Sequence, residues 1–118
     1  MADGSLYLSL LDLVAWDRGL RAGAVLKPAS WAEVFTPVTL SDGKSYPYGF
    51  GWRVFEVAGQ KVERHGGSWQ GFKTEIARYL GSDLTLIVLC NLAQADPARF
   101  TDGLAALLDP ALATSAAK

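Results

Sequence analysis

Hydrophobic residues have the spacing typical of a helix near the N-terminus, of strands in the middle of the chain, and of a helix again near the C-terminus. The first helical pattern follows Ser9, and Asp12 three residues later completes a capping box. Gly23 is well placed to end this helix in a left-handed conformation, so we predict a helix over residues 10–22. Its apolar positions fall mostly on one face: Leu10, Leu13, Val14, Trp16 and Leu20.

A second, shorter helix is predicted over residues 31–35. Ser30 and Glu33 repeat the capping arrangement, and Pro37 stops the helix because the residue before a proline disfavours helical backbone. The following residues, 36–47, read as an irregular loop with prolines and a turn signal at 41–43.

Four strands are predicted next, over residues 48–57, 61–66, 72–80 and 84–90. The last of these is apolar at nearly every position, which is typical of a strand covered on both faces. Asp96 then caps a closing helix with Pro97 at its first position, and we expect the end from Pro110 onward to fray. Short turns between consecutive strands favour an antiparallel meander. We therefore predict a single α+β domain over residues 1–118, with about four strands and helices at both ends packing on the sheet.

The composition and charge of the chain exclude several classes of protein. The 118 residues include 50% hydrophobic and 19% charged residues, and the formal net charge is -1, so we expect a globular chain that does not bind nucleic acid. Cys90 is the only cysteine, which excludes an internal disulfide. We find no apolar run long enough for a membrane span and no signal peptide.

Chemistry centres on His65, the only histidine in the chain. Glu63 and His65 alone are too few ligands for a metal site, and the Gly-x-Gly of residues 48–52 enters a strand, unlike a phosphate-binding loop. The candidate nucleophiles, none of which lies in a Gly-x-Ser-x-Gly elbow, are Ser41, Ser45, Ser68 and Ser82. We therefore expect no self-contained nucleophile. His65-Gly66-Gly67 itself is either a structural, exposed histidine or a place where glycines let a ligand approach backbone amides.

Four stretches of the chain resemble one family in the same order. They are residues 4–16, with Asp12-Leu13 and Trp16; the Tyr-Gly-x-Gly-Trp of 48–52; His65-Gly66-Gly67 with Gly71-Phe72; and the Asp-Leu-Thr strand of 83–91. This set resembles the C-terminal part of the serine beta-lactamase-like and penicillin-binding-protein-like hydrolases, in the branch of class C beta-lactamases, D-alanyl carboxypeptidases and esterases. Ser5 and Leu8 depart from the glycine and serine usual there, at packing positions.

The resemblance implies a partial beta-lactamase-like fold, and it implies functional roles for the residues of the histidine motif. His65 stands where the family has lysine or histidine, which positions the substrate and supports proton transfer. Gly66 and Gly67 keep the strand edge open to substrate, and the backbone amide of Ser68 is an oxyanion donor. Trp69 is predicted in the loop after the motif, and from that position it either lines the pocket or belongs to the core as most aromatic residues do. No metal or cofactor is implied.

The same resemblance implies that the Ser-x-x-Lys and Tyr-x-Asn motifs lie upstream in a parent protein. We therefore expect this chain to be a C-terminal fragment that is inactive alone. The intact parent would act on a beta-lactam, peptide or ester, and it is expected to be bacterial and exported. The parent-type sheet also takes strands and a helix from the upstream part, so their absence would leave an exposed sheet edge and an apolar face, and we expect a homodimer or a higher assembly. Two alternatives stay open: a non-catalytic domain that binds a ligand or partner, and a split enzyme completed by another polypeptide.

Overall fold

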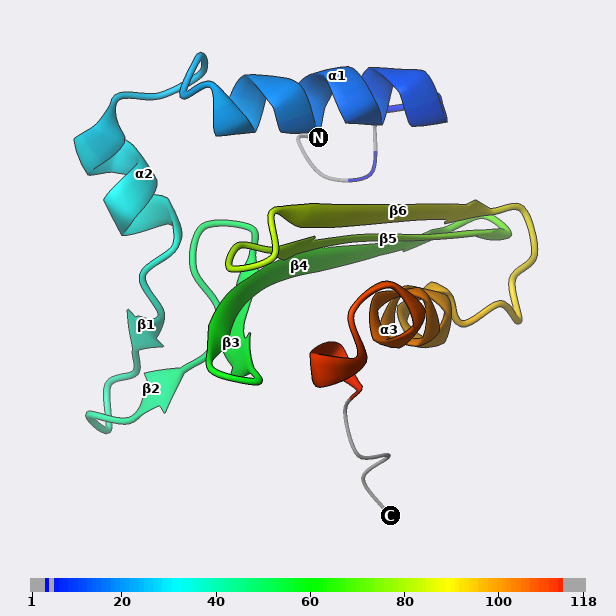
Figure 1. Ribbon diagram of the computed structural model, residues 1–118. Coiled ribbons are helices and arrows are strands. Elements are labelled where there is room, and N and C mark those ends of the chain that lie inside the picture. The colour runs from blue at the N-terminus through cyan, green and yellow to red at the C-terminus, as the bar shows by residue number, and fades with distance from the viewer. Residues whose placement is uncertain (1–3, 5, 114–118) are drawn as a thin grey trace.

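The computed structural model describes residues 4 and 6–113. It contains a four-stranded antiparallel sheet in the order β3-β4-β5-β6, with α1 over one face and α3 over the other (Figure 1). A two-stranded sheet, β1-β2, lies apart from it. The predicted α+β meander with helices at both ends is thus confirmed.

The N-terminal elements follow their local signals only in part. Helix α1 (Leu10–Arg21) begins at Ser9 with the predicted capping box. Helix α2 (Pro28–Val34) begins earlier than predicted, because Pro28 occupies its first turn and Ser30 lies inside it. The region predicted as an irregular loop contains β1 (Val38–Thr39) and β2 (Ser45–Tyr46), which close a small hairpin.

The sheet differs from the prediction mainly at two strands. Strand β3 (Arg53–Val57) is shorter than predicted, because residues 48–52 form a turn that touches it only through a Tyr48–Arg53 bridge. Strand β4 (Gln60–Trp69) is longer and carries the whole histidine motif, so Trp69 ends a strand and does not lie in a loop. The reason is a tight hairpin: Gln70 and Gly71 both have positive φ, which lets Trp69 pair directly with Phe72.

Strands β5 (Phe72–Tyr79) and β6 (Leu84–Cys90) lie close to their predicted bounds. Helix α3 (Pro97–Leu108) is capped by Asp96, whose side chain accepts from the Arg99 amide. The expected fraying at Pro110 is wrong for residues 110–112, which form the 3-10 helix η1 (Pro110–Leu112). Leu112 is 2% exposed because it packs into the core beneath the sheet, formed by Val62, Ala77, Tyr79, Ala105 and Leu112.

Candidate active site

The histidine motif lies on a strand edge that has no neighbouring strand among the described residues. Strand β3 pairs with β4 only as far as Arg53 opposite Arg64. Beyond that point, residues 65–69 pair with β5 alone. The other edge of this segment therefore presents backbone groups that can bond to a ligand.

The register decides which backbone groups point outward. The Lys61 carbonyl accepts a 3.0 Å hydrogen bond from the Leu80 amide, which belongs to the β5 side. In an antiparallel pair every second residue bonds to the same neighbour, so the odd-numbered residues of β4 bond toward β5. Gly66 and Ser68 consequently direct their N–H and C=O groups to the open edge. The Ser68 amide is thus geometrically able to donate to an oxyanion.

The side chains of β4 alternate between two faces, and the buried ion pairs identify each face. Glu63 bonds to Arg78, which bonds to Asp17 of α1, so Glu63 faces α1. Arg64 bonds to Asp102 of α3 and faces the other way. With a period of two, His65, Gly67 and Trp69 share the face of α1, whereas Gly66 and Ser68 do not.

Crowding from β5 explains the two motif glycines. A Cβ at Gly66 would lie 2.7 Å from Glu75 Oε2, and a Cβ at Gly67 would overlap Thr74 Oγ1. The Glu75 carboxylate is held in place by Arg64, with Nε–Oε1 at 2.6 Å. A larger residue at either position would therefore have to displace a neighbouring side chain.

His65 is exposed, and its imidazole has one specific partner. Nε2 lies 3.0 Å from the Tyr48 hydroxyl, and the ring centroids are 6.2 Å apart. Tyr48 was not predicted as a site residue. The signal that could have found it is the Tyr-Gly-x-Gly-Trp stretch, which the sequence marked as a strand and as one of the four family-like stretches but to which no site role was given.

Trp69 is 56% exposed and shares the face of His65. Two cavities, of about 360 and 350 Å³, lie elsewhere, near α1 and α2, and neither is lined by His65 or Trp69. Together with Phe72, its 51% exposed pairing partner in β5, Trp69 forms an open aromatic surface beside the motif.

Behind the motif, a network of buried charges joins α1 to the sheet. Arg78 is bonded to Asp17 at 2.9 Å and to Glu63 at 2.7 Å, and Arg21 is bonded to Asp17 at 2.7 Å. Burial alone would raise the pKa of Asp17, but hydrogen bonds from Arg21 and Arg78 outweigh it and lower that pKa. Burial raises the pKa of Glu63 despite the attraction of Arg78 and Lys61. The network fixes α1 over the face that carries His65.

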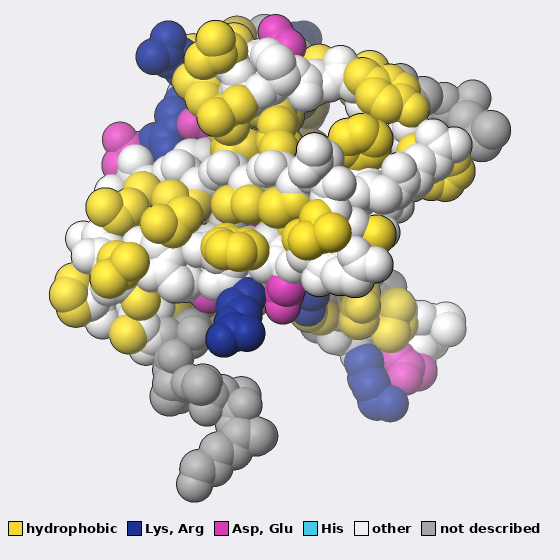
Figure 2. Space-filling view, turned by 90° about the vertical axis from the view of Figure 1, so that its right-hand side faces the viewer, with side chains coloured by type: hydrophobic (Ala, Val, Ile, Leu, Met, Phe, Trp, Pro, Cys, Tyr) yellow, Lys and Arg dark blue, Asp and Glu magenta, His cyan; other side chains and the backbone are white. Residues whose placement is uncertain are grey.

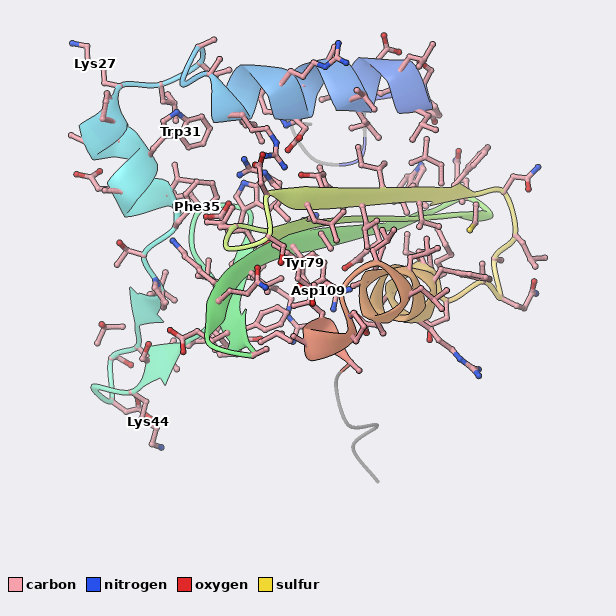
Figure 3. All side chains as sticks on the ribbon, viewed as in Figure 1. Lys27, Trp31, Phe35, Lys44, Tyr79 and Asp109 are labelled. Carbon is pink, nitrogen blue, oxygen red and sulfur yellow. The ribbon has the colours of Figure 1, made fainter. Side chains whose placement is uncertain are left out.

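One Ser-x-x-Lys spacing occurs at Ser41 and Lys44, although the sequence was expected to hold no self-contained nucleophile. Both residues are exposed in the β1–β2 turn, and Lys44 Nζ pairs with Asp42 at 3.0 Å. Figure 3 shows Lys44 at the tip of this hairpin, directed away from the sheet. The turn therefore gives no reason to place a nucleophile beside His65. A second such spacing, Ser115 to Lys118, lies outside the described residues.

Residues 4 and 6–113 offer neither a metal site nor a membrane-spanning helix. No cluster of three or more histidine, cysteine, aspartate or glutamate side chains is arranged to hold a metal ion there. Within the same residues, every helix is too short or too polar to cross a membrane.

Sequence comparison identifies relatives of the chain. No family model matches it. Penicillin-binding protein 4* of Bacillus subtilis (strain 168) is 35% identical over 91 residues, which are 75% of this chain and 20% of that protein. A D-aminopeptidase of Gluconobacter oxydans (strain 621H) is 31% identical over 106 residues, covering 90% of this chain and 20% of that protein. A D-aminopeptidase of Brucella anthropi is 29% identical over 91 residues, or 77% of this chain and 18% of that protein.

These matches confirm the resemblance: the chain is a relative of the serine beta-lactamase-like and penicillin-binding-protein-like hydrolases. The chain spans about a fifth of the length of the curated relatives it matches.

Proposed function

We propose that the chain is the C-terminal part of a serine hydrolase that acts by acyl transfer on a beta-lactam, peptide or ester. The observation that carries the proposal is the open edge of β4, where His65, two glycines and an outward-directed Ser68 amide stand in succession. The relatives support the same class of chemistry, since two of them are D-aminopeptidases by name and one is a penicillin-binding protein.

In this proposal each residue of the edge has a separate task. An extended substrate lies along residues 65–69 and bonds to the backbone groups that β3 leaves free. His65 positions the substrate and supports proton transfer, for which a histidine is suited near neutral pH. The Ser68 N–H stabilises the oxyanion, and Trp69 supplies an apolar wall. The nucleophile and its base must come from residues other than these, so we expect the chain by itself to be inactive.

The first test concerns the genomic sequence and the isolated chain. We expect the reading frame upstream of Met1 to encode Ser-x-x-Lys and Tyr-x-Asn, and the purified chain to turn over neither a chromogenic beta-lactam nor a D-alanyl ester or anilide. A clean intergenic region upstream would contradict the proposal that the chain is a fragment.

The second test addresses the Ser68 amide in the longer, active protein. Ser68→Pro removes the backbone N–H, together with the hydroxyl, on the open edge, where proline is compatible with a strand. We expect kcat to fall about 100- to 1000-fold, the usual loss for one oxyanion donor. Ser68→Ala keeps the amide and is the matched control, with activity close to that of the unaltered protein. Equal activity of the two variants would remove Ser68 from the mechanism.

A second candidate function is a non-catalytic domain that binds a ligand or partner on the same edge. It is favoured by the aromatic surface of Trp69 and Phe72, which can bind a ligand without any nucleophile. Hydrolysis of the ester by the pure chain, abolished by His65→Ala, would exclude this alternative.

We also propose that the isolated chain forms a homodimer. Figure 2 shows a band of hydrophobic side chains across the side of the molecule that lies on the right in Figure 1. Together with the unpaired edge of β4, this apolar surface favours association with a second copy. Light scattering after size exclusion should give twice the mass of one chain at micromolar concentrations; a monomer throughout that range would refute the dimer.

A further inference from the structure

The backbone of Tyr48 is held from several sides. Its carbonyl accepts from the Val38 amide at 3.0 Å, and its own amide donates to the Tyr46 carbonyl at 2.7 Å. Tyr48 also forms a bridge with Arg53, the first residue of β3. These contacts fix the backbone of Tyr48 beside the start of β3, and its side chain extends from there to His65 on β4.

The residues after Tyr48 form a turn that depends on two glycines, Gly49 and Gly51. A Cβ on Gly49 would overlap the backbone carbonyl of Val34, at the end of α2, and that carbonyl also accepts from the Phe50 amide at 2.9 Å. The Gly49 amide donates to the Trp52 carbonyl at 2.7 Å, and Gly51 has φ +79°. Gly49 thus allows the chain to pass this close to α2, and Gly51 allows the left-handed backbone that the turn needs.

Aromatic side chains of the turn and of the α2 region pack against each other. Trp52 meets the edge of the Phe35 ring, with centroids 5.9 Å apart, and Phe35 stacks on Trp31 at 5.5 Å. Figure 3 shows Trp31 and Phe35 on the side of α2 that faces the sheet. These contacts hold the Tyr-Gly-x-Gly-Trp stretch in one conformation. The side chain of its first residue, Tyr48, contacts His65.

The contact itself has a preferred direction of hydrogen bonding. Tyr48 Oη and His65 Nε2 are 3.0 Å apart, and either atom can donate, depending on the tautomer. A neutral imidazole nitrogen is a stronger base than a phenol oxygen, so the phenol O–H donates and Nε2 accepts. The ring proton must then be on Nδ1, because the bond made by one ring nitrogen decides the state of the other.

We propose that Tyr48 is a positioning residue for His65. It fixes the orientation of the ring and selects the Nδ1–H tautomer, so that neutral His65 presents one N–H donor to a carbonyl or carboxylate of the substrate. This inference deepens the proposed function and rests on it for the role of His65. The tautomer itself can be measured without turnover, so a failure of hydrolysis and a failure of this inference are distinguishable.

The test uses the fact that His65 is the only histidine. Nitrogen-15 NMR of the uniformly labelled chain, recorded over a pH series that extends to the alkaline plateau of its single imidazole, reports which ring nitrogen carries the proton in the neutral form. We expect Nδ1 to be protonated in the unaltered chain, and Tyr48→Phe to shift the population toward Nε2–H. Tyr46→Phe removes a hydroxyl from an exposed tyrosine two residues away and is the matched control, with the tautomer unchanged.

A majority of Nε2–H in the unaltered chain, or the same tautomer in Tyr48→Phe, would overturn the inference. If Tyr48→Phe fails to fold, the unaltered chain provides a second readout. The carbon-13 signal of Tyr48 Cζ should move as His65 titrates, while that of Tyr46 stays constant. A Tyr48 signal that ignores the titration overturns the inference equally.

Discussion

Replacing Arg78 by methionine tests whether the buried charges behind the motif hold the fold together. The Arg78 side chain is 7% exposed and contacts Asp17 Oδ1 at 2.9 Å and Glu63 Oε2 at 2.7 Å. Methionine keeps a long apolar side chain but removes both donors. The carboxylates of Asp17 and Glu63, 10% and 1% exposed, then lose a shared cation in a position with little access to water.

The expected cost follows from what each carboxylate keeps. Removing one partner of a buried ion pair usually costs about 3–5 kcal/mol. Asp17 retains Arg21 at 2.7 Å, and Glu63 retains Lys61 at 3.5 Å, so we expect a loss near the lower limit, about 3 kcal/mol. For a domain of this size, that corresponds to a fall in Tm of roughly 12 °C. Since a typical domain has about 5–15 kcal/mol of stability, the change is a large part of the total.

Urea denaturation followed by tryptophan fluorescence and circular dichroism measures the free energy of unfolding. Arg53→Met, at an exposed arginine of β3, is the matched control and should change it by less than about 0.5 kcal/mol. Adding Glu63→Gln to Arg78→Met should recover part of the loss, because it removes the uncompensated charge. A loss below about 1 kcal/mol for Arg78→Met, or one equal to that of Arg53→Met, would refute the reasoning.

The other predictions concern pH, a glycine and a helix cap. The lowered pKa of Asp17 contributes stability that is present above its ordinary value of 3.8 and is lost as the pH falls, so Asp17→Asn should flatten the acid side of a plot of Tm against pH. The raised pKa of Glu63 affects stability in the opposite direction: its contribution is present below 4.5 and is lost as the pH rises through the folded-state pKa. Glu63→Gln should therefore flatten that decline in Tm, and pH effects of equal sign for the two variants would contradict both assignments. Gly49→Ala should cost about 1–3 kcal/mol in urea denaturation because its Cβ overlaps a backbone carbonyl, whereas Gly19→Ala, in open space on α1, should stabilise by up to about 1 kcal/mol; equal effects would remove the steric explanation. Ser9→Ala should cost about 1 kcal/mol of unfolding free energy through loss of the α1 cap, and no change would show that the cap is dispensable.

The local signals of the sequence were sufficient for the elements whose causes are local. The capping box at Ser9 and the Asp96-Pro97 start of α3 lie where the sequence predicted, because a cap acts within one helical turn. The apolar run of β6 likewise predicted a strand between two covering layers, and α1 and α3 cover its two faces (Figure 1). The ordered motifs also pointed to the family that the relatives confirm.

Tertiary structure decided the features that depend on residues far apart in the chain. The predicted strand ended at Gly66, and Gly67 has no side chain to signal a strand, so the extension of β4 to Trp69 follows only from its pairing with β5. Leu112 looked like part of a fraying end because its burial depends on a core made by distant strands.

In the candidate site, too, some features could be predicted from the sequence and others depend on the tertiary structure. The sequence alone marked His65 as the centre of the chemistry, since it is the only histidine and stands beside two glycines. That β3 stops at Arg53 and leaves the edge open, and that Tyr48 reaches His65 at 3.0 Å, are consequences of how the chain returns on itself. Residue types and short-range spacing carry information about local conformation, but distances between remote side chains exist only once the sheet has formed.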